Sequence, residues 1–199
     1  MLNTAFALVS ELKNHYKAPK NKLLSLEKQG RIIKVVKGLY ETDKSVSPLL
    51  LSSAIYGPSY ISFETALSYW GWIPEKVTSI TAATFGKNKS KRFDSSFGTF
   101  LYRDIPKTAF PYEVYIINEG ERSFLIAGKE KSLCDILYRQ SPLESEKKLK
   151  EYLFENLRIV EEDFYSADFS LIFDLCDFYK STNLKILKKI AQKTMGGKS

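Results

Sequence analysis

The chain has 199 residues, of which 44% are hydrophobic and 27% are charged. This composition excludes a disordered or collagen-like chain, and the length suits one medium domain or a small domain joined to a larger one. No apolar run approaches the roughly 20 residues that span a bilayer, and residues 1–10 lack the pattern of a signal peptide, so we expect a cytoplasmic protein with no membrane partner.

Few residues of the sequence have the chemistry of a metal or cofactor site. Cys134 and Cys176 each lie among apolar neighbours at helical spacing, which favours buried, reduced thiols. The single histidine, His15, has no other ligand at metal-binding spacing. The sequence also contains no glycine-rich phosphate loop and no Ser/His/Asp set. We therefore predict no cofactor and no metal.

The positive charge gathers at the front of the chain. The net charge is +7, and residues 1–40 alone hold eight lysines and arginines against two glutamates, a net +6. Residues 142–178 hold four lysines and arginines against ten aspartates and glutamates, a net −6. The basic block predicts a polyanionic partner, with a purely structural basic lobe as the alternative, whereas the acidic block is typical of solvated helix faces.

The first 44 residues are predicted to form a small DNA-binding domain. Asn3 is expected to cap a helix from Thr4 to about His15, and Pro19 to open a second helix over Lys20 to Gln29. Within the second helix, Leu23, Leu24 and Leu26 are expected to face the core, and Gly30 to end it. Two short strands follow, Arg31 to Val36 and Leu39 to Glu41, with a tight turn at Lys37 and Gly38.

Helix, basic helix and basic hairpin is the order of a winged helix-turn-helix, with the second helix in the major groove and the hairpin along the backbone. Because base edges are read by polar groups and phosphates by cations, the candidate DNA contacts divide between these two elements. They are Lys20, Lys22, Ser25 and Lys28 from the helix, and Arg31, Lys34 and Lys37 from the hairpin.

Residues 45–199 are predicted to form a larger α+β domain with a mainly antiparallel sheet and a C-terminal helical region. A short helix from Ser47 to Ile55 and a helix capped by Ser62 come first. Alternating patterns then predict four strands: Val77 to Thr84, Phe93 to Tyr102, Tyr112 to Asn118 and Arg122 to Ala127. The expected later helices are Ser132 to Arg139, one begun by Ser141 and Pro142, Phe169 to Tyr179, and Asn183 to Lys193.

Two further groups of charged residues allow more than one interpretation. Lys87, Lys89, Lys91 and Arg92 lie between two predicted strands, and form either a second phosphate-contacting patch or a charged hairpin tip that prevents aggregation. Glu64, Glu130 and Asp135, with Lys131, could assemble a magnesium-dependent nuclease site. No spacing enforces that geometry, and Glu64 is explained better by the N-terminus of its own helix. We predict no catalytic residue.

Three stretches stand out together, in this order: NKLLSLEKQGRIIKVVKGLYE, YGPSYISFETALSYWGWIPEKVTSITAATFGKNKSKRFDSSFGTFLYRDI and LIAGKEKSLCDILY. Over Lys20 to Tyr138 they closely resemble the AbiEi-like antitoxins, the transcriptional-regulator halves of type IV (abortive infection) toxin–antitoxin operons. The resemblance implies a bacterial, non-enzymatic antitoxin that represses its own promoter through a winged helix and counteracts a nucleotidyltransferase-like toxin, directly or by another route. The alternatives are a metal-dependent nuclease and an orphan DNA-binding regulator without a toxin.

Overall fold

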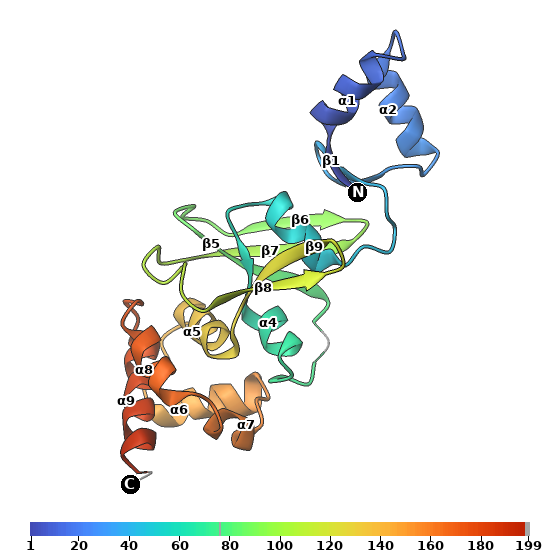
Figure 1. The fold of residues 1–199 in the computed structure, drawn as a ribbon. Helices are drawn as coiled ribbons and strands as arrows, with labels where there is room; N and C mark the ends of the chain where they lie inside the picture. Colours follow the sequence, from blue (N-terminus) through green and yellow to red (C-terminus); the bar gives the residue numbers. More distant parts are fainter. Residues whose placement is uncertain (76, 198–199) are drawn as a thin grey trace.

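A computed structural model of the chain describes residues 1–75 and 77–197. These residues form helices and two sheets, one of three strands and one of six, so the predicted α+β class is confirmed. Figure 1 shows the N-terminal residues as a lobe at one end, the six-stranded sheet in the middle, and the C-terminal helices beyond it. The lobe and the C-terminal helices therefore lie on different sides of the central sheet.

The N-terminal lobe, residues 1–41, combines two helices with a small sheet. Its elements are β1 (Leu2–Thr4), α1 (Ala5–Lys13), α2 (Pro19–Lys28), β2 (Ile33–Val36) and β3 (Leu39–Glu41). The sheet is antiparallel in the order β1-β3-β2. Strand β1 was not predicted, and it contains Asn3, the expected cap. The actual cap of α1 is Thr4, whose Oγ1 accepts a hydrogen bond from the Ala7 N–H at 3.1 Å.

Helix α2 and the hairpin lie close to their predicted positions. Pro19 opens α2, and Gly30, with a φ of +67°, follows it in the left-handed region that glycine adopts easily. Leu23 is buried and Leu26 packs beside it, but the prediction for Leu24 was wrong, since its side chain is 53% exposed. Successive residues point about 100° apart around a helix, so Leu23 and Leu24 cannot both face this small core.

The central sheet is mixed. Its strands are β4 (Tyr60–Ile61), β5 (Ser79–Phe85), β6 (Lys91–Ser95), β7 (Gly98–Ile105), β8 (Val114–Glu119) and β9 (Arg122–Ala127). The order β6-β7-β5-β4-β9-β8 contains three antiparallel pairs, while β5 pairs with β7 and β4 with β9 in parallel. The strand predicted over Phe93 to Tyr102 is in fact the β6–β7 hairpin. The two-residue β4 was missed because so short a segment shows no alternation.

Helices fill the rest of the second domain. The 3₁₀ helix η1 (Pro48–Leu51), α3 (Ser52–Ile55) and α4 (Phe63–Tyr69) precede β5, and α5 (Lys129–Arg139) follows β9. The C-terminal region contains α6 (Glu146–Glu151), the π-helix η2 (Tyr152–Asn156), α7 (Glu161–Tyr165), α8 (Phe169–Cys176) and α9 (Thr182–Gly196). The predicted C-terminal helical region is thus confirmed, although Ser145, not Ser141, caps α6. No helix in the described residues is both long and apolar enough to cross a membrane.

The main core lies between the sheet and the C-terminal helices. It includes Leu67 of α4, Leu133 of α5 and Leu187 of α9, all fully buried. Both cysteines are free and buried in this core, as predicted. A second cluster on the opposite face of the sheet joins Val35 and Leu39 of the lobe to a set of domain residues: Leu51, Ala82, Phe100 and Tyr102. The lobe is therefore packed against the sheet and is not a freely tethered unit.

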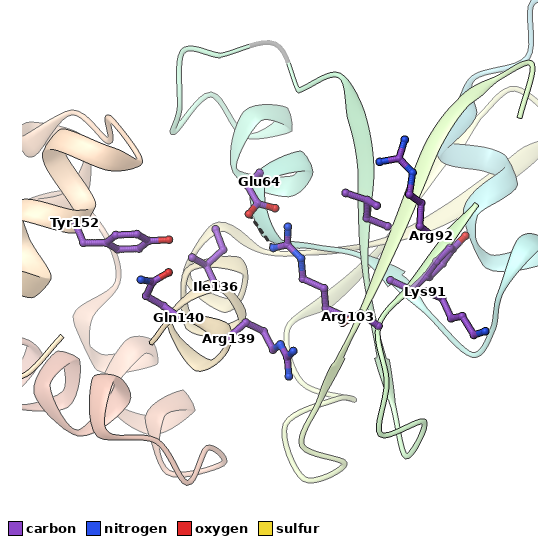
Figure 2. Close-up of a pocket in the computed structure, with 11 residues that line it drawn as sticks. Glu64, Lys91, Arg92, Arg103, Ile136, Arg139, Gln140 and Tyr152 are labelled. Carbon is purple, nitrogen blue, oxygen red and sulfur yellow. Dashed lines mark hydrogen bonds and ion pairs between the residues drawn. The ribbon is translucent and has the colours of Figure 1, made fainter. Parts of the chain in front are cut away.

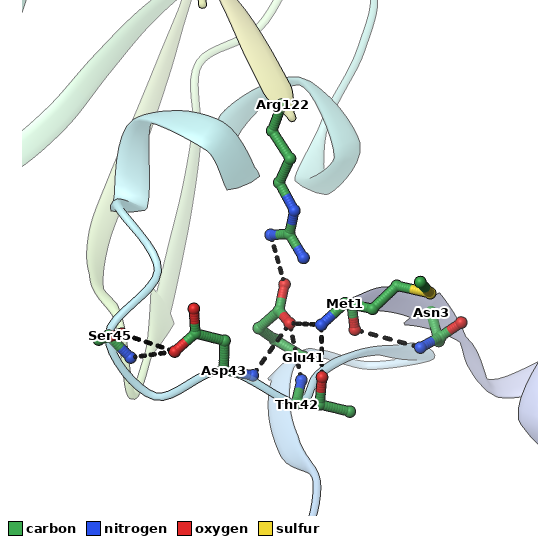
Figure 3. Close-up of polar contacts among 7 residues, drawn as sticks. All are labelled: Met1, Asn3, Glu41, Thr42, Asp43, Ser45 and Arg122. Atoms are coloured by element: carbon green, nitrogen blue, oxygen red, sulfur yellow. Dashed lines mark hydrogen bonds and ion pairs between the residues drawn. The ribbon is translucent and has the colours of Figure 1, made fainter. Parts of the chain in front are cut away.

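A buried carboxylate reinforces this junction between the lobe and the sheet domain (Figure 3). Glu41, fully shielded from solvent, accepts hydrogen bonds from Arg122 Nη1 at 2.8 Å and from the backbone N–H groups of Thr42 and Asp43 at 2.7 and 3.1 Å. The amino group of Met1 also contacts it. Burial opposes ionisation of Glu41, but these donors outweigh burial and lower its pKa to about 2. Glu41 is therefore charged at neutral pH.

Candidate nucleic-acid interface

The cations of the N-terminal lobe are available to a ligand. Lys20 and Lys28 are exposed on α2, and a second exposed set follows it: Arg31, Lys34 and Lys37. Lys22 is partly covered and lies 4.7 Å above the ring of Tyr16. Within residues 1–75 and 77–197, none of these six cations forms an ion pair. Their charge is consequently not neutralised by the protein itself.

Helix α2 presents one continuous outer face. Lys20, Leu24 and Lys28 are spaced four residues apart, so they follow one another along the helix. The exposed Leu24 adds an apolar side chain between two cations, and an apolar side chain can contact a thymine methyl group. Ser25 is partly covered, and its Oγ accepts a hydrogen bond from Gln29 Nε2 at 3.0 Å. Its hydroxyl group retains its own proton for donation.

The hairpin is bonded to the start of α1. Lys34 is exposed next to the buried Val35, because adjacent strand residues face opposite sides. Gly38 forms the turn with a φ of +84°, and its carbonyl oxygen accepts a hydrogen bond from the Ala5 N–H at 2.8 Å. That bond ties the tip of the hairpin to the start of α1. The structure thus brings the predicted hairpin cations and the α2 cations onto a single compact lobe.

The second predicted basic group is divided between two neighbouring cavities and a tyrosine ring. Lys91 and Arg92 line a cavity of about 500 Å³, and Lys89 lines a neighbouring cavity of about 430 Å³. Lys87 lies elsewhere, 5.3 Å above the ring of Tyr56. The alternative of a charged hairpin tip was wrong: residues 86–90 connect β5 to β6, and these strands are not neighbours because β7 lies between them.

The larger cavity contains charged residues that were not predicted from the sequence. Figure 2 shows Arg103 of β7 reaching toward Glu64 of α4, with Arg139 of α5 and the adjoining Gln140 nearby. Arg103 Nη1 lies 2.8 Å from Glu64 Oε1, and its guanidinium group lies 4.9 Å from the centre of the Phe63 ring. Arg103 and Arg139 lie on elements far apart in sequence, and only the fold brings them together.

Phe63 adopts an unusual backbone conformation beside this cavity. Its φ is +57°, a left-handed value that is costly for an aromatic residue, and its side chain is fully buried. The preceding Ser62 is the N-cap residue of α4, as predicted, but its side chain forms no capping bond, and its Oγ instead donates a hydrogen bond to Asp135 at 2.7 Å. Burial of the Phe63 ring and the Ser62 contact hold this turn, which places Glu64 against Arg103.

The three carboxylates of the nuclease interpretation have separate environments. Glu64 binds Arg103, and Glu130 accepts a hydrogen bond from the Asp168 N–H at 3.2 Å. Asp135 is fully buried, with its oxygens bonded to four groups: Lys131 Nζ at 2.6 Å, Tyr179 OH at 2.6 Å, Ser62 Oγ at 2.7 Å and Tyr60 OH at 3.0 Å. Among the described residues, no three His, Cys, Asp or Glu side chains are arranged to hold a metal ion.

The network around Asp135 is saturated. Burial raises the pKa values of Tyr60 and Tyr179 well above the ordinary tyrosine value, and the nearby Asp135 carboxylate raises both further. Both phenols therefore stay protonated and act as donors. With its two oxygens accepting four bonds, this carboxylate is committed to holding α5 against β4 and the C-terminal region.

No protein-family model and no curated protein matches the chain. The features of the molecule that bear on function are therefore its charged surfaces. They are the exposed cations of α2 and the hairpin at one end, and a cationic pair of cavities beside the central sheet. Both arrangements are chemically suited to phosphate groups.

Proposed function

We propose that the protein is an AbiEi-like antitoxin that binds its own promoter through the N-terminal lobe and counteracts a nucleotidyltransferase-like toxin. The observation that supports DNA binding most strongly is that α2 and the β2–β3 hairpin, with Arg31 just before it, display six cations that form no ion pair with the described residues. The lobe runs strand, helix, helix, hairpin, and its first strand pairs with the last. That order and pairing support the interpretation of the lobe as a winged helix.

In this proposal α2 enters the major groove. Its ten residues give a length of about 15 Å, and a B-DNA major groove about 12 Å wide admits one helix. Lys20, Leu24 and Lys28 then face the base edges. Arg31, Lys34 and Lys37 lie against the flanking phosphates, where cations supply sequence-independent affinity.

The toxin-opposing role is assigned to residues 45–199. The resemblance to AbiEi-like antitoxins spans Lys20 to Tyr138, which covers α2, the hairpin, the whole six-stranded sheet and most of α5. A resemblance that continues through both parts of the molecule supports both halves of the proposed function. The predicted domain boundary at residue 44 stays a prediction. The hydrophobic cluster that contains both Val35 of the lobe and Phe100 of the sheet indicates that the two parts fold against each other.

DNA binding is tested by replacing the wing cations Lys34 and Lys37 with alanine together. Removing one phosphate contact should reduce the slope of log affinity against log salt by about 0.9, so the double variant should bind more weakly and show a slope smaller by up to about two units. The measurement is a gel-shift or anisotropy titration on the DNA upstream of the gene at several salt concentrations.

The matched control removes two exposed lysines far from the lobe, Lys147 of α6 and Lys185 of α9. This variant changes the net charge equally but should retain the wild-type slope. If the Lys34 and Lys37 variant kept both affinity and slope, or if the control were weakened as much, the wing assignment would be contradicted.

Antitoxin activity is tested by co-expression with the downstream gene. The wild-type chain should restore growth, and the Lys34→Ala/Lys37→Ala variant should restore it too if promoter binding and neutralisation use different surfaces. Substitutions are preferable to deleting the lobe, because deletion would uncover Phe100 and Tyr102, which Val35 and Leu39 cover. Failure of the wild-type chain to rescue growth, with promoter binding intact, would instead favour the orphan regulator.

A further inference from the structure

Two adjoining cavities lie beside β6, β7 and α5. The first, of about 500 Å³, is lined by Glu64, Arg103 and Tyr152 among others. The second, of about 430 Å³, is lined by Lys89, Lys107 and Tyr138 among others. Arg139, at the end of α5, lines both. Each volume lies in the range of about 300 to 1,000 Å³ that small-molecule sites occupy.

The lining of these cavities is strongly cationic. It includes six cationic side chains: Lys89, Lys91, Arg92, Arg103, Lys107 and Arg139. The carboxylates are two, Glu64 and Asp104. Asp104 is already occupied, since its oxygens accept hydrogen bonds from Thr84 Oγ1 and from the N–H groups of Lys87 and Asn88. The excess of positive charge favours an anionic ligand.

Most of these cations have no protein partner. Arg103 is paired with Glu64, and Arg92 is paired with the exposed Asp94 at 2.8 Å. In the described part of the chain Arg139 and the three lysines form no ion pair. Arg139 lines both cavities. Its planar guanidinium group can donate two parallel hydrogen bonds to one phosphate.

Glu64 distinguishes this site from a simple phosphate site. One of its oxygens binds Arg103, while the other, Oε2, is buried and has no hydrogen-bond partner among the described residues. A buried acceptor left unpaired costs free energy, so a ligand that donates a hydrogen bond there gains affinity. Tyr152 and Gln140 lie on the same side of the cavity as Glu64 (Figure 2).

We propose that these cavities bind a nucleotide, with its phosphates on Arg139 and the neighbouring lysines and a ribose or base donor on Glu64. A nucleotide combines the two chemistries that the lining requires, anionic oxygens and a hydrogen-bond donor, within one ligand. The source is either a free nucleoside polyphosphate or a nucleotide of a single strand, and both present the same groups. This site is independent of the proposed promoter contacts.

The test is calorimetric titration of the full chain with four probes: ATP, GTP, inorganic pyrophosphate and a 12-nucleotide single-stranded RNA. The wild type should bind at least one nucleotide and pyrophosphate at one site. Arg139→Gln should weaken every probe that binds by about tenfold or more, because it removes a charge-assisted contact. Stronger binding of the RNA than of ATP or GTP would identify a single strand as the ligand. Stronger binding of ATP or GTP than of the RNA would identify a free nucleotide.

Glu64→Gln separates the two halves of the site. It removes an acceptor and a negative charge, so nucleotide affinity should fall several-fold while pyrophosphate affinity stays equal or rises. Arg158→Gln is the matched control, since Arg158 is exposed, lines neither cavity and forms only a surface ion pair with Glu75. It should bind all probes as the wild type does.

Three outcomes would overturn the proposal. One is no binding of any probe by the wild type, and another is unchanged binding by Arg139→Gln. The third is a loss of nucleotide binding in Lys34→Ala/Lys37→Ala, which would place the ligand on the lobe. Promoter binding by Arg139→Gln is measured in parallel. If nucleotide binding is not found, the proposed promoter recognition is still decided by its own salt-dependence test.

Discussion

The junction at Glu41 provides a quantitative test of how the lobe is held. Replacing Glu41 with glutamine keeps the shape of the side chain but removes its charge. Glu41 is fully buried, and its pKa is lowered from 4.5 to about 2. At about 1.4 kcal/mol per pH unit, the shift corresponds to an upper limit of about 3.5 kcal/mol. The main partner, Arg122, is 31% exposed, so solvent screening reduces the expected loss to about 2 kcal/mol.

The effect should depend on pH in a definite direction. Because the folded pKa lies below the unfolded one, the charged Glu41 stabilises the fold fully above about pH 4.5, and this stabilisation is lost as pH falls toward 2. The free energy of unfolding is measured by urea titration at pH 7, 5 and 3. Glu41→Gln should be less stable at pH 7 by about 2 kcal/mol, with a smaller difference at pH 3.

A double-mutant cycle with Arg122→Gln identifies the responsible partner. The coupling between the two substitutions should be about 1 to 2 kcal/mol, since Arg122 donates the cross-lobe hydrogen bond. A difference of less than about 0.5 kcal/mol at pH 7, or one that stayed constant from pH 7 to 3, would refute the reasoning that a charged Glu41 fastens the lobe.

Two other substitutions test other parts of the fold. Asp135→Ala leaves the fully buried Lys131 without its 2.6 Å partner, so urea titration should show a loss of about 3 to 5 kcal/mol, and a loss under 1 kcal/mol would contradict a saturated ionic network. Gly38→Ala forces a side chain to a φ of +84° where no atom lies within 4 Å of the new Cβ, so strain alone should cost about 1 to 2 kcal/mol. Unchanged thermal unfolding of this variant would show that the turn relaxes.

The local patterns of the lobe could be predicted, but the first strand of its sheet could not. Pro19, Gly30 and Gly38 mark helix and turn boundaries by their own backbone preferences, so α2 and the hairpin fall where expected. Strand β1 is three residues long and becomes a strand only by pairing with β3, about 37 residues away. Its hydrogen bonds come from tertiary structure, which local propensity does not record.

The candidate sites show the same limit. Clustered lysines are visible in a sequence, so the cations of α2 and the hairpin were predicted, and five of the six are exposed. The cavity residues Arg103, Arg139 and Glu64 come from three elements that only the parallel β5–β7 pairing and the packing of α5 bring together. Asp135 seemed a candidate catalytic group in the sequence, but burial and four donors give it a structural role.

Sequence-specific binding by the lobe is tested most directly by one comparison of affinities. Fluorescence anisotropy at physiological salt compares a duplex from the upstream promoter with a shuffled duplex of equal length. Specific sites bind about 10³-fold or more tightly than nonspecific DNA, so we expect a ratio in that range for the wild type. Lys28→Ala on α2 should lower the ratio, whereas Lys34→Ala on the wing should weaken both duplexes equally. Equal wild-type affinity for the two duplexes, or no binding to either, would contradict promoter recognition.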